Sequence, residues 1–329
     1  MFGGVQSAMP RRKPPQHEVE ARRAEQRRKI GNLNTLRVAP KTKKRYEAAV
    51  AAFVAYVGMT IWSIHDMEEL ERWILVYIDV LWDRGKSIGA AQDLMSGVGY
   101  FLRKRKICLE AWHIIHVWRI HDFPNRVLPA TAELSLALAG LALSQGRERL
   151  AAALVLTFHT FLRTGELLNC RKTHFSLNKQ GKGVLVLPWT KGGQRKGEIE
   201  NVTIDEAGIG GWLVRVLAGL HLGDPLLDLS RHQLGRWWQE SLAAFGIDDV
   251  GFTFYSMRRG GASHFFRTTG NLPAALLRGR WEHTKTAKIY ITEGMQVMVS
   301  LSFSGATCEA LQQYIDYFYR VSASLNITF

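Results

Sequence analysis

The chain has 329 residues, of which 47% are hydrophobic and 10% aromatic, so it can bury the cores of about two domains. No apolar run approaches the roughly 20 residues that a membrane-spanning helix needs, and the first residues lack the pattern of a secretory signal, so we expect no membrane partner. The three cysteines lie far apart without a CxxC pair, which argues against a zinc finger and predicts free thiols in a reducing, intracellular compartment.

The net charge of +14 is concentrated near the N-terminus. Residues 1–45 hold 13 Lys/Arg and 3 Asp/Glu, a net charge of +10, whereas the other 284 residues hold 30 and 26, a net charge of +4. We therefore define residues 1–38 as a basic tail. Such a tail either binds a polyanion such as nucleic acid or is a solvated, disordered segment. The run from Glu18 to Ile30 is able to form a basic helix on contact with phosphates.

Residues 39–121 predict an all-helical domain of four helices. The second helix has a capping-box-like start at Asp66 and ends at Gly85. Apolar residues recur at helical spacing in each segment: Tyr46, Val50, Phe53 and Val57; Leu70, Trp73, Ile74, Tyr77, Ile78 and Leu81; Ala91, Leu94, Val98, Phe101 and Leu102; Leu109, Trp112 and Ile115. The cations expected to contact a polyanion from this domain are Lys43, Lys44, Arg45, Arg103, Lys104, Arg105 and Lys106.

Residues 122–129 form the expected linker, because Pro124 and Pro129 stop helices and stiffen the connection. The second domain, residues 130–302, combines helices with a small sheet. We expect helices near 131–144, 147–162, 208–220 and 231–245, and strands at 184–187 and 200–204.

The two strands flank the segment Thr190–Gly197, a glycine-rich basic turn typical of a hairpin loop. Residues 303–329 form a last helix with Leu311, Ile315 and Phe318 on one apolar stripe. The predicted fold class is therefore mainly α with a small β-sheet.

Residues able to hold and attack a phosphodiester occur in order along this second domain. They are Arg163 and Glu166 in one turn, Lys191 between the strands, Tyr255 and Arg258 at a helix start, and then Trp281 and Tyr290, nine residues apart. Taken singly, each is an ordinary surface cation or core aromatic, so the ordered set carries the inference. Guanidinium groups can neutralise the charge that builds on phosphate oxygens without a metal ion, and a phenol can act as a nucleophile.

This set resembles the signature of the tyrosine recombinase family, which includes phage integrases, Xer and Cre-like proteins. That signature is an Arg-x-x-Glu turn, a Lys on a β-hairpin, a His-x-x-Arg helix start, a His or Trp, and a Tyr nine residues later. The resemblance implies an N-terminal helical core-binding domain followed by an α+β catalytic domain. It implies partners too: double-stranded DNA with specific recombination sites, and copies of the same chain, two on one site and four in the synapse.

The resemblance also implies a role for each residue. Tyr290 attacks phosphorus to give a 3′-phosphotyrosyl bond and a free 5′-hydroxyl, with no cofactor, metal or ATP. Arg163 and Arg258 hold the phosphate, Lys191 is the general acid and Trp281 donates its indole N–H. Glu166 fixes the Arg163 turn, and Arg259 contacts DNA. The C-terminal helix would dock into a neighbouring protomer; the alternative is that its stripe packs on its own domain.

Tyr255 departs from the family pattern, which most often has His there. Because a free tyrosine titrates near pH 10, we expect Tyr255 to donate a hydrogen bond to phosphate rather than to shuttle a proton. His283 follows Trp281 by two residues and is out of register for the family position. Lys196 and Arg195 share the turn of Lys191 and are alternatives to it.

Two further groupings carry less weight. Cys108, His113, His116 and His121 are either a metal site or, more simply, packed helix residues, since no paired ligand motif occurs. The Gly-Gly pairs at 192–193 and 260–261 are not part of a P-loop, because no GxxxxGK[ST] sequence occurs.

Three functions remain open from the sequence. The first is a site-specific DNA recombinase. The second is a DNA-binding protein of the same fold with weak or lost catalysis, a possibility raised by Tyr255. The third is a type IB-like topoisomerase that relaxes DNA without exchanging partners.

Overall fold

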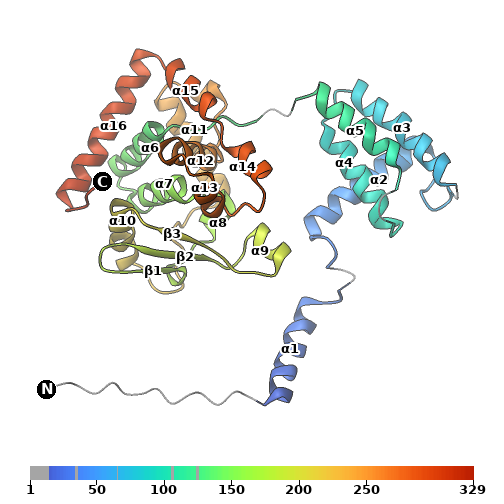
Figure 1. The fold of residues 1–329 in the computed structure, drawn as a ribbon, viewed down its shortest axis with the longest axis horizontal. Coiled ribbons are helices and arrows are strands. Elements are labelled where there is room, and N and C mark those ends of the chain that lie inside the picture. The colour runs from blue at the N-terminus through green and yellow to red at the C-terminus, as the bar shows by residue number, and fades with distance from the viewer. Residues whose placement is uncertain (1–14, 34–35, 65, 105–106, 124–125) are drawn as a thin grey trace. The chain divides into compact units, whose positions relative to one another are not determined.

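The computed structural model describes residues 15–33, 36–64, 66–104, 107–123 and 126–329, and the chain divides into two compact units, Met1–Asn125 and Arg126–Phe329 (Figure 1). The boundary falls within the predicted linker, of which Pro124 lies outside the described residues. None of the described helices is long and apolar enough to cross a membrane.

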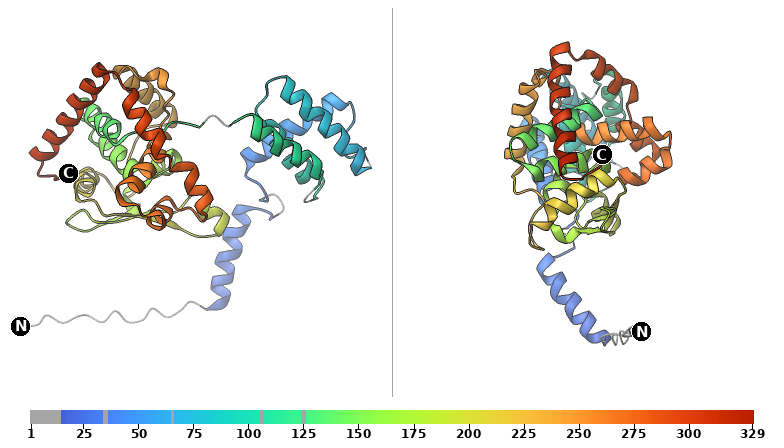
Figure 2. Two further views of the ribbon diagram at one scale, coloured as in Figure 1. Left: turned by 45° about the horizontal axis from the view of Figure 1, so that its top comes forward. Right: turned by 90° about the vertical axis from the view of Figure 1, so that its left-hand side faces the viewer.

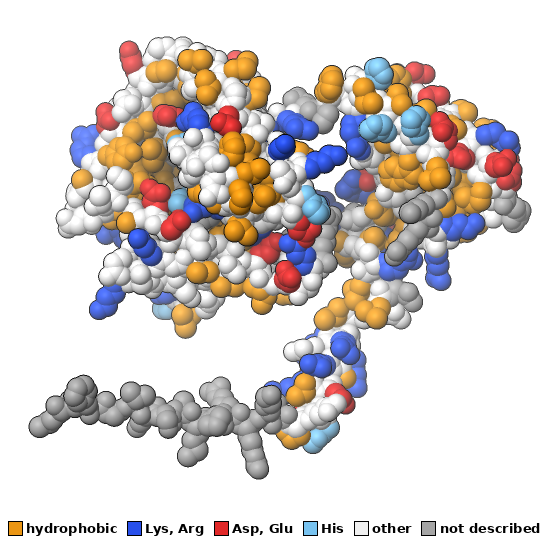
Figure 3. Space-filling view, viewed as in Figure 1, with side chains coloured by type: hydrophobic (Ala, Val, Ile, Leu, Met, Phe, Trp, Pro, Cys, Tyr) orange, Lys and Arg blue, Asp and Glu red, His pale blue; other side chains and the backbone are white. Residues whose placement is uncertain are grey.

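All the regular secondary-structure elements in the described residues of the first unit are helices, as predicted. Its helices are α1 (Gln16–Ile30), α2 (Pro40–Val57), α3 (Met67–Asp83), α4 (Ile88–Phe101) and α5 (Leu109–His121). Helices α2 to α5 enclose one apolar core, because the predicted stripes face one another; its most buried members include Phe53, Leu70, Ile74, Leu94 and Ile115. Helix α1 buries no side chain, and Lys and Arg side chains gather along it (Figure 3).

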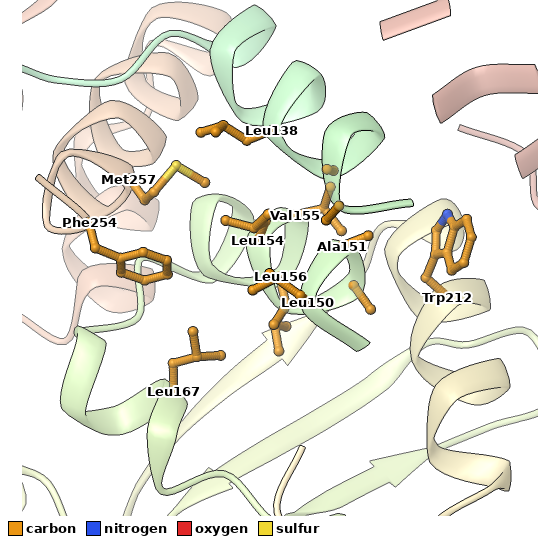
Figure 4. Packing of buried hydrophobic residues seen from close by; sticks show 14 of the residues in the cluster. Leu138, Leu150, Ala151, Leu154, Val155, Leu156, Leu167, Trp212, Phe254 and Met257 are labelled. Atoms are coloured by element: carbon orange, nitrogen blue, oxygen red, sulfur yellow. The ribbon is translucent and has the colours of Figure 1, made fainter. Parts of the chain in front are cut away.

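The second unit is a helical domain with a small sheet at one side. Its helices are α6 (Ala132–Ser144), α7 (Glu148–Thr160), α8 (Thr164–Leu168), α9 (Lys191–Lys196), α10 (Ala207–Ala218), α11 (Arg231–Ala244), α12 (Ser256–Thr269), α13 (Leu272–Gly279), α14 (Thr284–Tyr290), α15 (Glu293–Ser302) and α16 (Gly305–Ser324). Helix α7 is central: its residues Leu150, Leu154 and Leu156 pack in one core with Met257 of α12 and Trp212 of α10 (Figure 4).

The sheet is antiparallel in the order β1-β2-β3, formed by β1 (Phe175–Leu177), β2 (Gly183–Leu187) and β3 (Glu200–Ile204). Strands β2 and β3 match the prediction, whereas β1 was not predicted. The connection between β2 and β3 is not the open hairpin loop that we expected. It winds into α9, because the Thr190 side chain caps that helix by accepting a hydrogen bond from the backbone N–H of Gly193 at 2.8 Å.

The C-terminal helix α16 lies along α6 of the same chain (Figures 1 and 2). Its stripe of Leu311, Ile315 and Phe318 is buried in the core of the second unit. Of the two alternatives that the sequence left open, the stripe packs on its own domain in the single chain, because Gly140 on α6 lets the backbone of α16 approach closely at Tyr314. Docking of this helix into a neighbouring protomer stays a prediction.

Candidate active site

Arg163 and Glu166 form a closed turn at the start of α8. Arg163 is the N-cap residue, and its backbone N–H donates to Glu166 Oε2 at 2.8 Å while its guanidinium Nη1 donates to Glu166 Oε1. This is one half of a capping box, the Glu166 carboxylate on the Arg163 backbone N–H, and the same carboxylate also holds the Arg163 side chain. The predicted coupling of Arg163 and Glu166 is thus present, with Glu166 buried and Arg163 partly accessible.

Arg258 lies in the first turn of α12 and is completely buried. Its guanidinium donates through Nη1 to the backbone carbonyl of Phe161 and through Nη2 to that of Gly279 at 2.8 Å. Its Nε has no hydrogen-bond partner within the described residues. The residue therefore ties the end of α7 to the end of α13, and one buried donor is left over.

Tyr290 ends α14 and lies against both Arg258 and Trp281. The guanidinium carbon of Arg258 lies 5.1 Å from the Tyr290 ring centre, and the Trp281 ring is stacked on Tyr290 at 4.7 Å between centroids. The indole Nε1 of Trp281 is buried and finds no acceptor in the described parts of the chain. Two of the buried donors that lack a partner, Arg258 Nε and Trp281 Nε1, thus belong to the side chains that pack against the Tyr290 ring, and an acceptor bound there would satisfy them.

Tyr255, at the start of α12, reaches the same place. Its hydroxyl lies 2.6 Å from the hydroxyl of Tyr290. The pKa of Tyr255 is raised by burial in the first place and by this hydrogen bond in the second. Each of the two tyrosines also interacts electrostatically with Arg163 and with Arg258. The fold therefore brings together residues as far apart in the sequence as Arg163 and Tyr290, which are separated by 127 positions.

Arg280 is a member of the cluster that the sequence did not reveal. Its side chain is only 4% exposed and donates to Glu166 Oε2 at 2.7 Å, and its Nε lies 3.4 Å from a carboxylate oxygen of Glu200 on β3. The residue has a left-handed backbone with φ of 56°, which turns its side chain back under α8. Arg280 thus links the Arg163 turn to the sheet.

The cluster is a buried network of three guanidiniums and two carboxylates. Burial alone would raise the pKa of Glu166, but the charges of Arg280 and Arg163 lower it below its ordinary value, so this carboxylate is ionised. Burial, together with the charges of Arg163 and Arg280, lowers the pKa of Arg258 to about 10. With Arg163, Arg258 and Arg280 against Glu166 and Glu200, the site carries one positive charge in excess, which suits it to an anion.

No hydrogen bond or ion pair joins Lys191 to the other candidate residues in the described part of the chain. It begins α9, its side chain is exposed, and it makes no ion pair or hydrogen bond within the described residues. Lys196 at the other end of α9 does reach toward the site, since its Nζ lies 2.9 Å from Glu282, the residue after Trp281. The ion pair between Lys196 and Glu282 holds α9 near Trp281. The Lys191 amine forms no such pair among the described residues.

Arg259 is not the exposed DNA contact that we expected. It is 5% exposed, and its Nη1 donates to the backbone carbonyl of Val127 at 2.6 Å while Nη2 lies 3.4 Å from Thr292 Oγ1. Successive side chains on an α-helix point about 100° apart, so Arg259 points in a different direction from the inward-facing Arg258. In that direction it reaches Val127, close to the start of the second unit. Arg259 therefore anchors the chain at Val127.

The candidate DNA-contacting cations of the first unit are exposed but not equivalent. Arg45 forms a two-pronged ion pair with Asp93 at 2.8 and 2.6 Å and so joins α2 to α4. Lys43 pairs with Glu47 one turn later, whereas Lys44 is exposed and forms no ion pair with any residue that the structure describes. Arg103 and Lys104 are exposed after the end of α4, and the remaining two candidates, Arg105 and Lys106, lie outside the described residues.

The histidines do not form a second site. His113, His116 and His121 are exposed on α5 rather than packed as we expected, because the buried face of that helix is taken by Ala111, Ile115 and Trp118. Burial raises the pKa of the Cys108 thiol to about 11. No group of three or more potential metal ligands occurs in the described part of the chain.

His283 is likewise exposed, so its side chain points away from the phenol cluster. It directly precedes α14, two residues after the buried Trp281, and makes no side-chain capping hydrogen bond within the described residues. The register argument from the sequence placed it outside the site, and the geometry agrees.

Comparisons with known proteins give a likeness in structure only. No protein-family model and no curated protein matches the sequence. The integrase of transposon Tn1549 in complex with transposon right end DNA is 13% identical, with 85% of this chain and 98% of that chain covered at a TM-score of 0.58. A variant of the same integrase with a circular-intermediate DNA gives 14% identity, coverage of 85% and 98%, and a TM-score of 0.55.

A lambda integrase dimer bound to a core site is also similar, at 17% identity and a TM-score of 0.52, with 85% of this chain and 77% of that chain covered. At these identities the likeness shows the fold alone. It confirms the predicted architecture, a mainly helical chain with a small antiparallel sheet, and the resemblance to tyrosine recombinases at the level of the fold.

Proposed function

We propose that this chain is a site-specific DNA recombinase of the tyrosine recombinase type, which cleaves and rejoins DNA through a covalent bond to Tyr290. The observation that carries the proposal is the setting of the Tyr290 phenol. It lies against a buried guanidinium, that of Arg258, and a buried indole, that of Trp281, each of which keeps one donor without an acceptor among the described residues. A phosphate oxygen would satisfy both donors.

The reaction follows from these groups. The Tyr290 oxygen attacks phosphorus, the phenolic proton is released to solvent, and the bond from phosphorus to the 5′ oxygen breaks. Lys191 gives that oxygen a proton, and its unpaired, exposed amine on α9 is consistent with this task. Arg163 and Arg258 stabilise the charge on the phosphate, while Glu166 and Arg280 keep Arg163 in place. The reverse attack by a new 5′-hydroxyl reseals the strand without an external energy source.

The partners of this reaction are double-stranded DNA with a specific site and further copies of the chain. The likeness in fold to integrases that were solved with DNA, one of them as a dimer, supports this part of the proposal. We place the protein with DNA inside the cell, with two copies on one site and four in the exchange complex.

Replacing Tyr290 with Phe tests the proposal. We expect the full-length protein to form a covalent adduct with a pool of nicked duplexes that carry a randomised segment, where the nick lets the small leaving strand diffuse away. Tyr290→Phe should form none, because the nucleophilic oxygen is gone, as judged on a denaturing gel. Tyr319→Phe, which removes an exposed phenol on α16, is the matched control and should react like the wild type.

Each outcome selects among the three functions. Binding of the pool without an adduct would contradict the recombinase proposal and favour the DNA-binding protein. An adduct with relaxation of supercoiled plasmid, but no exchange between two duplexes of the trapped sequence, would favour the topoisomerase. Sequencing DNA from the covalent complexes identifies the target.

A further inference from the structure

The phenols of Tyr255 and Tyr290 share a hydrogen bond that joins the start of α12 to the end of α14. Their oxygens are 2.6 Å apart, and their rings are tilted by 58° with centroids 6.0 Å apart. Within the described residues neither hydroxyl has another hydrogen-bond partner. The oxygen that we propose as nucleophile is therefore held by a single neighbouring group.

The direction of this hydrogen bond follows from which phenol keeps its proton. Each phenol has one proton to donate. Burial, reinforced by the contact with Tyr290, raises the pKa of Tyr255, so Tyr255 stays protonated at neutral pH. When Tyr290 begins to lose its proton, Tyr255 is the donor and the Tyr290 oxygen is the acceptor.

Other groups hold the ring and the backbone of Tyr290. Trp281 is stacked on it and the Arg258 guanidinium lies 5.1 Å from its centre. The Tyr290 backbone is held too, since the Ser263 hydroxyl donates to the Tyr290 carbonyl at 3.2 Å. Rotation of the phenol about its own axis leaves its oxygen in place, so the hydrogen bond from Tyr255 decides where the Tyr290 proton and lone pairs point.

We propose that Tyr255 is a positioning residue that donates a hydrogen bond to the Tyr290 oxygen, orients it for attack and stabilises the phenolate as it forms. This differs from the role expected from the sequence, a hydrogen bond from Tyr255 to phosphate, because here the single hydroxyl proton of Tyr255 is directed at the Tyr290 oxygen. The catalytic part of the inference rests on the proposed function, whereas the coupling between the two phenols does not.

The coupling is tested without DNA by titrating the phenols. The full-length chain is labelled with difluorotyrosine, which brings phenol titration toward neutral pH, and the Tyr290 fluorine resonance is identified by its loss in Tyr290→Phe. In Tyr255→Phe the pKa of Tyr290 should rise by about one unit, because a donor to the phenolate has been removed. Tyr319→Phe is the control and should leave the Tyr290 titration unchanged. An unaltered Tyr290 titration in Tyr255→Phe would overturn the inference.

The catalytic part is tested by the rate of adduct formation on the nicked-duplex pool. Tyr255→Phe should react about tenfold more slowly at neutral pH, and its pH–rate profile should move to higher pH by the same shift as the titration. Tyr255→His, which offers an N–H donor, should recover part of the rate. A Tyr255→Phe protein with the wild-type rate and profile would refute the role in attack.

The two proposals fail in different ways. If the wild-type protein forms no adduct, the recombinase proposal fails while the titration still decides whether the phenols are coupled. If the wild type forms an adduct and the Tyr255 variants do not differ from it, the recombinase proposal stands and the positioning role falls.

Discussion

Arg280 shows how a residue outside the reacting group can determine whether the site exists. Arg280 forms ion pairs with both Glu166 and Glu200, and all three side chains are buried. The arginine that we propose to hold phosphate, Arg163, bonds to the same carboxylate, Glu166. Without Arg280, Glu166 would keep one ion pair, that with Arg163, and Glu200 would be a buried carboxylate without an ion pair among the described residues.

Arg280→Met should therefore destabilise the protein strongly. Removing one member of a buried ion pair costs about 3–5 kcal/mol, because the remaining charge is left without compensation. The free energy of unfolding is measured by denaturant titration. The matched control is Arg215→Met, which breaks an exposed pair with Glu148 and should change stability little. Equal effects of the two substitutions would contradict the assignment.

The loss in Arg280→Met should shrink in acid. The folded-state pKa of Glu166 lies below its ordinary value of about 4.3, so its stabilising contribution is complete above that value and is lost as the pH falls through the lower, folded value. The wild type and Arg280→Met should therefore converge in stability as the solution is acidified below about pH 4. A gap that stays constant with pH would mean that Arg280 acts through packing alone.

The contrast between Arg258 and Arg280 explains what the sequence could predict at this scale. Arg258 was predicted because it stands three residues after Tyr255 in an ordered motif. Arg280 directly precedes Trp281, yet nothing in the sequence marked it, since its role depends on a left-handed backbone and on two carboxylates from distant elements. Its neighbour Arg278 turns instead to Asp205 at 2.6 Å.

At the scale of elements, two glycines set how closely α12 approaches its neighbours. A side chain on Gly260 would meet the backbone carbonyl of Ala130, and one on Gly261 would meet that of Phe158 on α7. This close approach brings Arg258 within reach of the Phe161 carbonyl. The glycine pair that the sequence excluded from a P-loop therefore has a packing role.

Gly261→Ala should lower stability by about 1–3 kcal/mol, because overpacking forces the two helices apart. It should also reduce adduct formation, since Tyr255 and Arg258 are carried at the start of the displaced helix α12. Gly235→Ala on α11 is the control: nothing lies within 4 Å of the added carbon, and the change should raise stability by about 0.5–1 kcal/mol. Both effects are read from thermal or denaturant unfolding. A neutral Gly261→Ala would show that α12 can shift without cost.

The elements with strong periodicity were predicted well, whereas β1 and α9 were not. Helices α2 to α5 match the expected segments because each has an apolar stripe several turns long. Strand β1 has three residues, too few to show an alternation, and it is fixed by pairing Phe175 with Leu185. Helix α9 contains two glycines, which disfavour helix, and it forms because Thr190 caps it and Lys196 is tethered to Glu282.

For the whole molecule, the distribution of charge bears on DNA binding. The net charge of the chain comes largely from residues 1–45, and the described part of that segment includes α1, which is exposed on all sides. A helix with no buried face is stabilised by little except its own backbone, so a polyanion is the natural partner for its cations. The second unit supplies the reacting groups but carries a smaller share of the positive charge.

Substituting Arg27 and Arg28, in the last turn of α1, tests whether α1 contributes to phosphate binding. If they contact phosphates, Arg27→Gln with Arg28→Gln should make the plot of log affinity against log salt shallower by up to about 1.8, because about 0.9 is lost for each contact. The control removes the same charge at Lys179 and Lys182, in the β1–β2 turn beside α10 and away from α8, α9 and α14 (Figure 1). That pair should leave the slope unchanged, since its cations lie far from the proposed phosphate site. Fluorescence anisotropy with a labelled duplex at several salt concentrations gives both slopes.

Equal slopes for the wild type and the α1 variant would mean that α1 is a solvated tail. If the α1 variant and the Lys179 and Lys182 variant lost the same amount of slope, only the net charge of the chain would matter.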